Sequence, residues 1–248
     1  MANNPQVVIF QEDEKALNYR YKLDYPTGPN ILVKSLEHDY EEFKEKNKII
    51  SNNRVNDKTV YFLHPYKDNV YVDESIGENY FLEEKLELYK RAASLLGAKS
   101  ISTKVSLMER QSITTDANGE VNYNAIKLEA GSKSKIENNY KNSLEIFEEF
   151  ETQDNFNKER NIDDLYKFIE TNNLDHELGL VTLIERRDSR QSGTLLTKRT
   201  VKSEITSEYN NLLEVSAKLN SPVFSVSGGY KRKLQEVNTL MVDIEFIF

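Results

Sequence analysis

Apolar residues recur at helical spacing in four stretches of the chain. The clearest stripe comprises Leu82, Leu86, Tyr89, Ala93 and Leu96, and Gly97 follows it directly. An apolar residue at every third or fourth position is typical of an amphipathic helix with one face toward a core. The pattern predicts helices at about residues 36–49, 80–97, 162–173 and 207–219.

Elsewhere the apolar period is two, which is typical of β-strands with one buried face. Short strands are expected at 6–10, 18–24, 59–63 and 69–72, and another around 144–150. Two longer hairpins are also expected. The first joins alternating apolar positions around 101–107 to those around 126–130, and the second joins 178–185 to 195–205. A last pair of strands is expected at 223–230 and 240–248.

These elements predict an α+β fold. A mostly antiparallel β-sheet with two long hairpins would be covered by about four amphipathic helices. The length of 248 residues is near the upper limit for one hydrophobic core. A single α+β domain over residues 1–248 is therefore expected, with a soft division at the acidic segment 151–160.

Composition and charge narrow the class of protein. The chain has no cysteine, which excludes disulfides, cysteine-ligated zinc and thiol nucleophiles. It has no apolar stretch of the roughly 20 residues that a membrane-spanning helix needs, and no signal peptide is evident. The formal net charge of −8 argues against binding nucleic acid. A soluble, cytoplasmic protein is expected.

No local motif indicates catalysis, a metal or a nucleotide. The sequence lacks G-x-S-x-G, G-x-x-x-x-G-K-[ST] and G-x-G-x-x-G. His38 precedes Glu41 and Glu42 at a spacing that metal sites use, but three or four ligands are needed, and a solvated helix face is the simpler interpretation. We therefore expect no cofactor and no metal, and a non-enzymatic protein is favoured over an enzyme whose site has no local motif.

One basic cluster departs from the acidic balance of the chain. It falls on the second predicted hairpin and comprises Arg186, Arg187, Arg190, Lys198, Arg199 and Lys202. Such a patch can contact an anionic lipid, a nucleic-acid backbone or an acidic partner. The alternative is that these charges protect a strand edge from unwanted pairing.

The favoured function is action through protein–protein contacts, with copies of the same chain or with another protein in a larger assembly. Long amphipathic strands present edges that can pair, and no catalytic motif accompanies them. The alternative is a pore-forming effector that meets a membrane only after a conformational change. The layout of helices around two extendable hairpins is similar to that of gasdermin-like and perforin-like pore formers, without a shared sequence motif. The first hairpin is the candidate pore wall, through Ile101, Val105, Leu107, Ile126 and Leu128.

Overall fold

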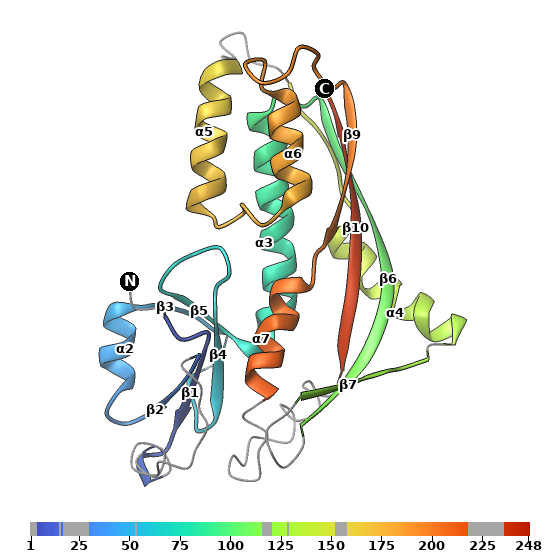
Figure 1. Cartoon of the computed structure of the whole chain (residues 1–248). Helices are drawn as coiled ribbons and strands as arrows, with labels where there is room; N and C mark the ends of the chain where they lie inside the picture. The colour runs from blue at the N-terminus through green and yellow to red at the C-terminus, as the bar shows by residue number, and fades with distance from the viewer. Residues whose placement is uncertain are drawn as a thin grey trace. The chain divides into compact units, whose positions relative to one another are not determined.

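The fold combines helices with two β-sheets (Figure 1). The structure is a computed structural model, and it describes residues 4–14, 16, 30–52, 54–115, 121–127, 129–151, 158–217 and 236–248. These residues form six helices and two five-stranded sheets, so the predicted α+β class is confirmed. The strands expected at 18–24 and 223–230 lie outside the described residues.

The chain divides into two compact units. The first contains Met1–Phe81, Glu109–Lys127 and Ser207–Asn238, and the second contains Leu82–Met108, Leu128–Thr206 and Thr239–Phe248. Because each unit is assembled from three separated segments, local sequence composition gives no sign of this division. The residues on both sides of the acidic segment 151–160 belong to the second unit.

The first unit contains a mixed sheet. Its strands are β1 (Val7–Gln11), β2 (Ile31–Ser35), β3 (Lys48–Ile50), β4 (Thr59–Leu63) and β5 (Val70–Asp73), in the order β2-β1-β4-β5-β3. β1 pairs with β2 in parallel and β3 pairs with β5 in parallel, whereas β4 is antiparallel to both of its neighbours. The hairpin predicted from 59–63 and 69–72 is therefore confirmed.

Both faces of strand β1 are buried, which explains its uninterrupted apolar run. Val7 and Ile9 pack in one cluster with residues of helix α7 (Ser207–Ala217), including Leu212. Val8 and Phe10 pack in a second cluster on the other face, with Phe43 of helix α2 (Tyr40–Lys46). The helix predicted at 207–219 is confirmed as α7.

Helix α2 is much shorter than the predicted helix 36–49. Ser35 ends β2, and Asp39 is the N-cap of the helix. The helix ends before Lys48, because residues 48–50 pair in parallel with Val70–Val72 of β5. The β-branched residues at 49 and 50 favour this strand, which only the tertiary partner could supply.

The second sheet contains β6 (Ser100–Thr115), β7 (Val121–Ala125), β8 (Phe147–Glu149), β9 (Lys198–Glu204) and β10 (Val237–Ile247). The order is β7-β6-β10-β9, and β8 also pairs with β6. The described residues contain four further helices. They are α3 (Glu74–Leu95), α4 (Ala130–Leu144), α5 (Lys158–Thr171) and α6 (Leu178–Arg187). None of the helices in the described residues has the length and apolar character needed to cross a membrane.

Helix α3 confirms the strongest periodic pattern in the sequence. The stripe that begins at Leu82 and ends at Leu96 is buried throughout. The helix starts at Glu74, six residues earlier than predicted, and Gly97 follows it with a φ of 69°. Glycine adopts this left-handed conformation without steric cost, so it ends the helix as expected. Helix α5 confirms the helix predicted at 162–173.

The two predicted hairpins have different outcomes. β6 and β7 form an antiparallel hairpin, but β7 covers 121–125 and not 126–130. The second hairpin is wrong, because residues 178–187 form helix α6. Leu180, Leu183 and Ile184 are buried at helical spacing, so this short apolar run suits either structure until its packing is known. β9 pairs instead with the C-terminal strand β10.

Candidate functional site

Strand β6 has an edge that another strand covers only in part. β8 pairs with Ser100–Ser102, and the Thr103 amide N–H donates to the Ile146 carbonyl oxygen at 3.0 Å. Beyond this point, residues 104–107 have no strand partner on that edge among the described residues. We call residues 104–107 the β6 gap.

Two carboxylates occupy the β6 gap in place of a strand. The Val105 amide N–H donates to Glu145 Oε1 at 3.3 Å, and the Leu107 amide N–H donates to Glu137 Oε1 at 3.1 Å. Alternate residues of a strand direct their N–H groups to the same edge. Glu145 and Glu137 therefore satisfy the two donors that an additional antiparallel strand would use next.

Helix α4, which contains Glu137 and is followed directly by Glu145, is weakly packed. Of the α4 side chains that the structure describes, only Leu144 is buried. Glu129, at the N-cap position, makes no side-chain capping hydrogen bond. A helix that buries so little apolar surface gains little stability from tertiary packing. Displacement of Glu137 from β6 would therefore cost little beyond the hydrogen bond itself.

Strand β9 is the other edge of this sheet, and it is charged. The Ile205 amide N–H donates to the Leu240 carbonyl oxygen, so the N–H and C=O groups of Lys198, Thr200 and Lys202 point away from β10. The carbonyl oxygen of Glu204, which points the same way, accepts a hydrogen bond from Lys85 Nζ at 3.1 Å. Lysines along an edge strand disfavour pairing with another chain.

A buried polar network holds β9 to helix α3. Lys85 is fully buried, and its Nζ lies 2.5 Å from Glu177 Oε1. Glu177 Oε2 accepts hydrogen bonds from the Tyr89 hydroxyl at 2.8 Å and from Ser203 Oγ at 3.2 Å. These hydrogen bonds partner the buried ammonium group of Lys85 and the mostly buried carboxylate of Glu177, which stabilises the fold of the second unit.

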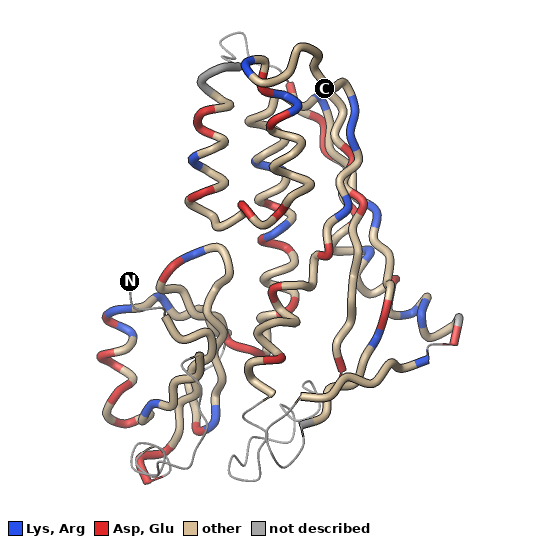
Figure 2. Tube along the Cα trace, viewed as in Figure 1, with Lys and Arg blue, Asp and Glu red and all other residues tan. Residues whose placement is uncertain are grey.

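The basic residues singled out in the sequence do not share one hairpin. Arg186 and Arg187 lie on α6, Arg190 follows that helix, and Lys198, Arg199 and Lys202 lie on β9. Figure 2 shows basic and acidic residues interspersed along the chain. Lys198 pairs with Glu245 at 2.8 Å, and Lys202 lies 3.8 Å from Asp243.

Two of the arginines have structural partners. Arg190 bonds both oxygens of Asp188 and also Asp163, and its hydrogen bonds hold the pKa of Asp188 below the usual value. Arg187 is half-buried, donates to the Leu196 carbonyl oxygen at 2.6 Å and lies 3.9 Å from the centre of the Phe248 ring. Arg187 is thus the only half-buried member of the cluster, and the other five basic residues are exposed.

The candidate pore-wall residues also have defined places. Ile101, Val105 and Leu107 lie on β6 and are buried. Ile126 follows β7 and is half-buried, and Leu128 lies outside the described residues. The structure thus places three of the five on one face of a single strand.

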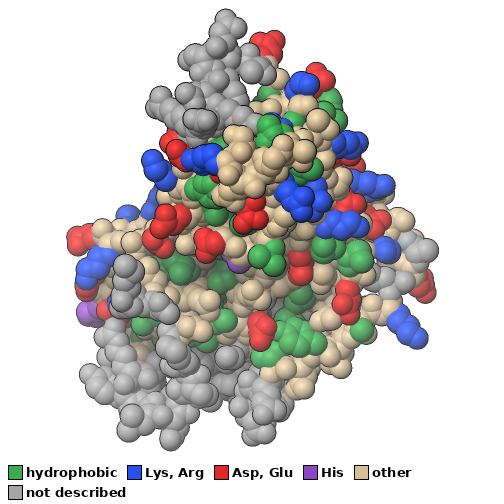
Figure 3. Space-filling model, turned by 45° about the horizontal axis from the view of Figure 1, so that its top comes forward, with side chains coloured by type: hydrophobic (Ala, Val, Ile, Leu, Met, Phe, Trp, Pro, Cys, Tyr) green, Lys and Arg blue, Asp and Glu red, His purple; other side chains and the backbone are tan. Residues whose placement is uncertain are grey.

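Exposed apolar side chains are divided among several elements. Among the residues that the structure describes, the large ones are Met108, Tyr123, Phe147, Leu178 and Leu195. On the face drawn in Figure 3, hydrophobic side chains lie in small groups among charged ones.

The sequence did not single out Glu137 or Glu145. No local signal marks them among the many glutamates of the chain, because their role depends on which backbone groups they meet. Comparisons with family models, with curated proteins and with solved structures find no match to this chain.

Proposed function

We propose that this protein acts through contacts with other protein chains, by addition of a β-strand at the β6 gap. The observation that supports this proposal is that the amides of Val105 and Leu107 are bonded by side-chain carboxylates instead of a strand. An incoming strand would replace these two bonds with backbone carbonyl oxygens. The first partner to test is a second copy of the chain. The absence of cysteine favours the cytoplasmic location expected from the sequence.

Glu137 and Glu145 would then control association by competing with the incoming strand. A hydrogen bond to a charged group contributes about 1.5–3 kcal/mol. Removal of both carboxylates should therefore favour strand addition by at least about tenfold for each bond, since 1.4 kcal/mol is a factor of ten. Helix α4 supplies little apolar packing to oppose its displacement.

The test is the self-association of a Glu137→Ala/Glu145→Ala variant, measured by size-exclusion chromatography with light scattering over a range of concentrations. We expect the variant to form oligomers at lower concentration than the wild-type chain. Hydrogen exchange should show slower exchange at Val105 and Leu107 in the assembled state. The amides of Lys198 and Thr200 on the charged β9 edge should be unaffected.

A Glu41→Ala/Glu45→Ala variant is the matched control. It removes two exposed glutamates from α2 and changes the net charge equally, without touching β6. If both double variants associate to the same extent, charge alone explains the effect. If the wild-type chain and the Glu137→Ala/Glu145→Ala variant both stay monomeric at high concentration, strand addition between copies is rejected.

Membrane perforation is the second candidate function. The observation that favours it is the length of β6, which has 16 residues, whereas a membrane-crossing strand needs about 9–11. Its apolar positions Ile101, Val105 and Leu107 would face lipid only after leaving the core. Dye release from anionic and neutral liposomes tests this candidate. Absence of release from either, by the intact chain and by proteolytically trimmed forms, would reject it.

A further inference from the structure

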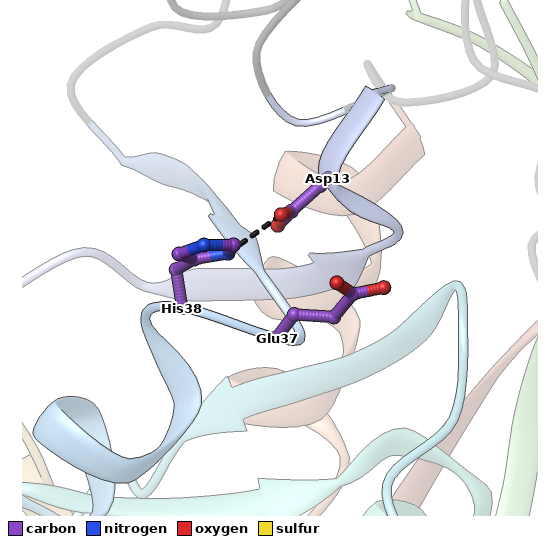
Figure 4. A group of neighbouring side chains, drawn as sticks. All are labelled: Asp13, Glu37 and His38. Carbon is purple, nitrogen blue, oxygen red and sulfur yellow. Dashed lines mark ion pairs between the residues drawn. The ribbon is translucent and has the colours of Figure 1, made fainter.

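Three side chains with metal-binding groups converge in the first unit (Figure 4). They are Asp13, Glu37 and His38, and one ligand atom of each lies within 4.8 Å of the others. Asp13 and His38 face one another, with 2.5 Å between Asp13 Oδ2 and His38 Nδ1. The two segments that meet here are more than twenty residues apart in the sequence.

The parallel pairing of β1 and β2 brings these side chains together. Gln11 and Ser35, the last residues of the two strands, are directly opposite in the register. The Leu36 amide N–H donates to the Gln11 carbonyl oxygen at 2.8 Å, so the chain segments stay together beyond the strands. Asp13 follows β1 by two residues, and Glu37 and His38 follow β2 by two and three. Polar side chains from neighbouring carboxyl ends commonly form ligand sites.

The orientation of Asp13 is set by neighbours that are not ligands. Its Oδ1 accepts a hydrogen bond from Ser35 Oγ, which leaves Oδ2 directed at His38. Ser35 Oγ also accepts a hydrogen bond from the His38 amide N–H at 3.0 Å. The Glu37 side chain, by contrast, is exposed and has no hydrogen bond or ion pair within the described part of the chain. One carboxylate of the group is therefore available for a cation.

The donor set selects the class of metal. Imidazole nitrogen together with two carboxylates suits Zn²⁺ and related first-row ions, whereas Ca²⁺ and Mg²⁺ prefer oxygen ligands alone. Ligands about 2.0–2.1 Å from a tetrahedral Zn²⁺ lie about 3.3 Å from one another. The His38 and Asp13 atoms would need to separate by less than about 1 Å to reach this spacing, which small side-chain rotations allow.

We propose that Asp13, Glu37 and His38 form a binding site for a divalent transition-metal ion, with Zn²⁺ as the best match. Two carboxylates and one imidazole have a net negative charge in either protonation state of the imidazole, so they attract a dication. Three protein ligands leave a fourth position for water. The bound ion would connect the segments that follow β1 and β2, and it would stabilise the first unit. This site is independent of strand addition at β6.

The test is Zn²⁺ binding to the full, chelator-treated chain by isothermal titration calorimetry, with zinc chloride as the titrant. We expect one saturable site in the wild-type chain and a melting temperature that rises with zinc concentration. His38→Ala and Asp13→Asn should each lower the affinity at least about tenfold, which is the lower end for loss of a group that supports a metal. Circular dichroism identifies any variant that fails to fold, and Glu37→Gln tests the site without disturbing Ser35.

Two control variants separate this site from general zinc adsorption. His176→Ala removes an exposed histidine of the second unit, and Glu41→Gln removes an exposed carboxylate of α2. Both should retain the wild-type affinity. The proposal is overturned if the wild-type chain shows no saturable 1:1 binding. It is also overturned if His38→Ala and Glu37→Gln bind zinc as the wild-type chain does, or if only His176→Ala loses binding.

Discussion

Replacement of Lys85 by methionine should destabilise the protein strongly. Methionine is similar in length and apolar, so the packing of the buried stem is largely kept and the change isolates the ammonium group. The variant loses the 2.5 Å contact with Glu177 and the 3.1 Å hydrogen bond to the Glu204 carbonyl oxygen. Glu177 would then hold a carboxylate in the interior without its cation.

The expected loss is about 3–5 kcal/mol in the free energy of unfolding, the range for breaking a buried ion pair on one side. The hydrogen bonds from Tyr89 and Ser203 to Glu177 remain, which argues for the lower end of that range. A domain is typically stable by only about 5–15 kcal/mol, so the variant should be close to unfolding.

Urea denaturation followed by circular dichroism measures this loss. Lys167→Met is the control, because Lys167 is exposed and lies 4.0 Å from Asp164, and it should cost less than about 1 kcal/mol. A Lys85→Met/Glu177→Gln double variant should be less destabilised than the sum of its single variants, because the uncompensated charge is gone. A loss below about 1 kcal/mol for Lys85→Met would contradict the buried ion pair.

Three further predictions concern the cores. Burial lowers the pKa of His64 in the folded chain to about 3. As the pH falls below about 6.5, the His64 imidazole is therefore protonated in the unfolded chain but stays neutral in the folded chain, which favours unfolding. Between pH 6.5 and 5 the wild-type chain should therefore lose about 2 kcal/mol more stability than His64→Phe in urea melts, and parallel losses would refute this. A Cβ at Gly179 would lie 2.5 Å from Val201 Cγ1, so Gly179→Ala should lower the melting temperature, whereas Gly193→Ala in open space should not. Leu86→Ala should cost about 2–5 kcal/mol in the same melts, and a loss under about 0.5 kcal/mol would place Leu86 outside the core.

The long periodic elements were predictable because the spacing of their apolar residues gives a single buried face in only one type of secondary structure. The α3 stripe is buried from Leu82 to Leu96, and Leu240, Val242, Ile244 and Phe246 of β10 are fully buried as their alternation predicts. A sustained apolar pattern of one period leaves no other regular structure with a single apolar face.

The secondary structure of short or polar segments could not be predicted from their own residues. Residues 178–187 contain an apolar run that suits a strand or a helix, and packing of Gly179 against Val201 shows that a helix lies close to β9. Residues 130–144, for which no helix was predicted, form helix α4, and Ile136, Tyr140 and Leu144 lie four residues apart along it. In such segments the partner surface outweighs local propensity.

The sequence by itself determined the fold class, the main helix and the apolar strands of this protein, because burial of apolar area depends on periodicity along the chain. Only the tertiary structure decided which polar groups meet. Lys85 lies among buried apolar residues of α3 and forms an ion pair with Glu177. The Glu137 carboxylate accepts a hydrogen bond from the Leu107 amide in the β6 gap. Asp13 reaches His38 because two parallel strands end side by side. Hydrogen bonds and ion pairs act over a few ångströms in three dimensions, and spacing along the sequence does not encode them.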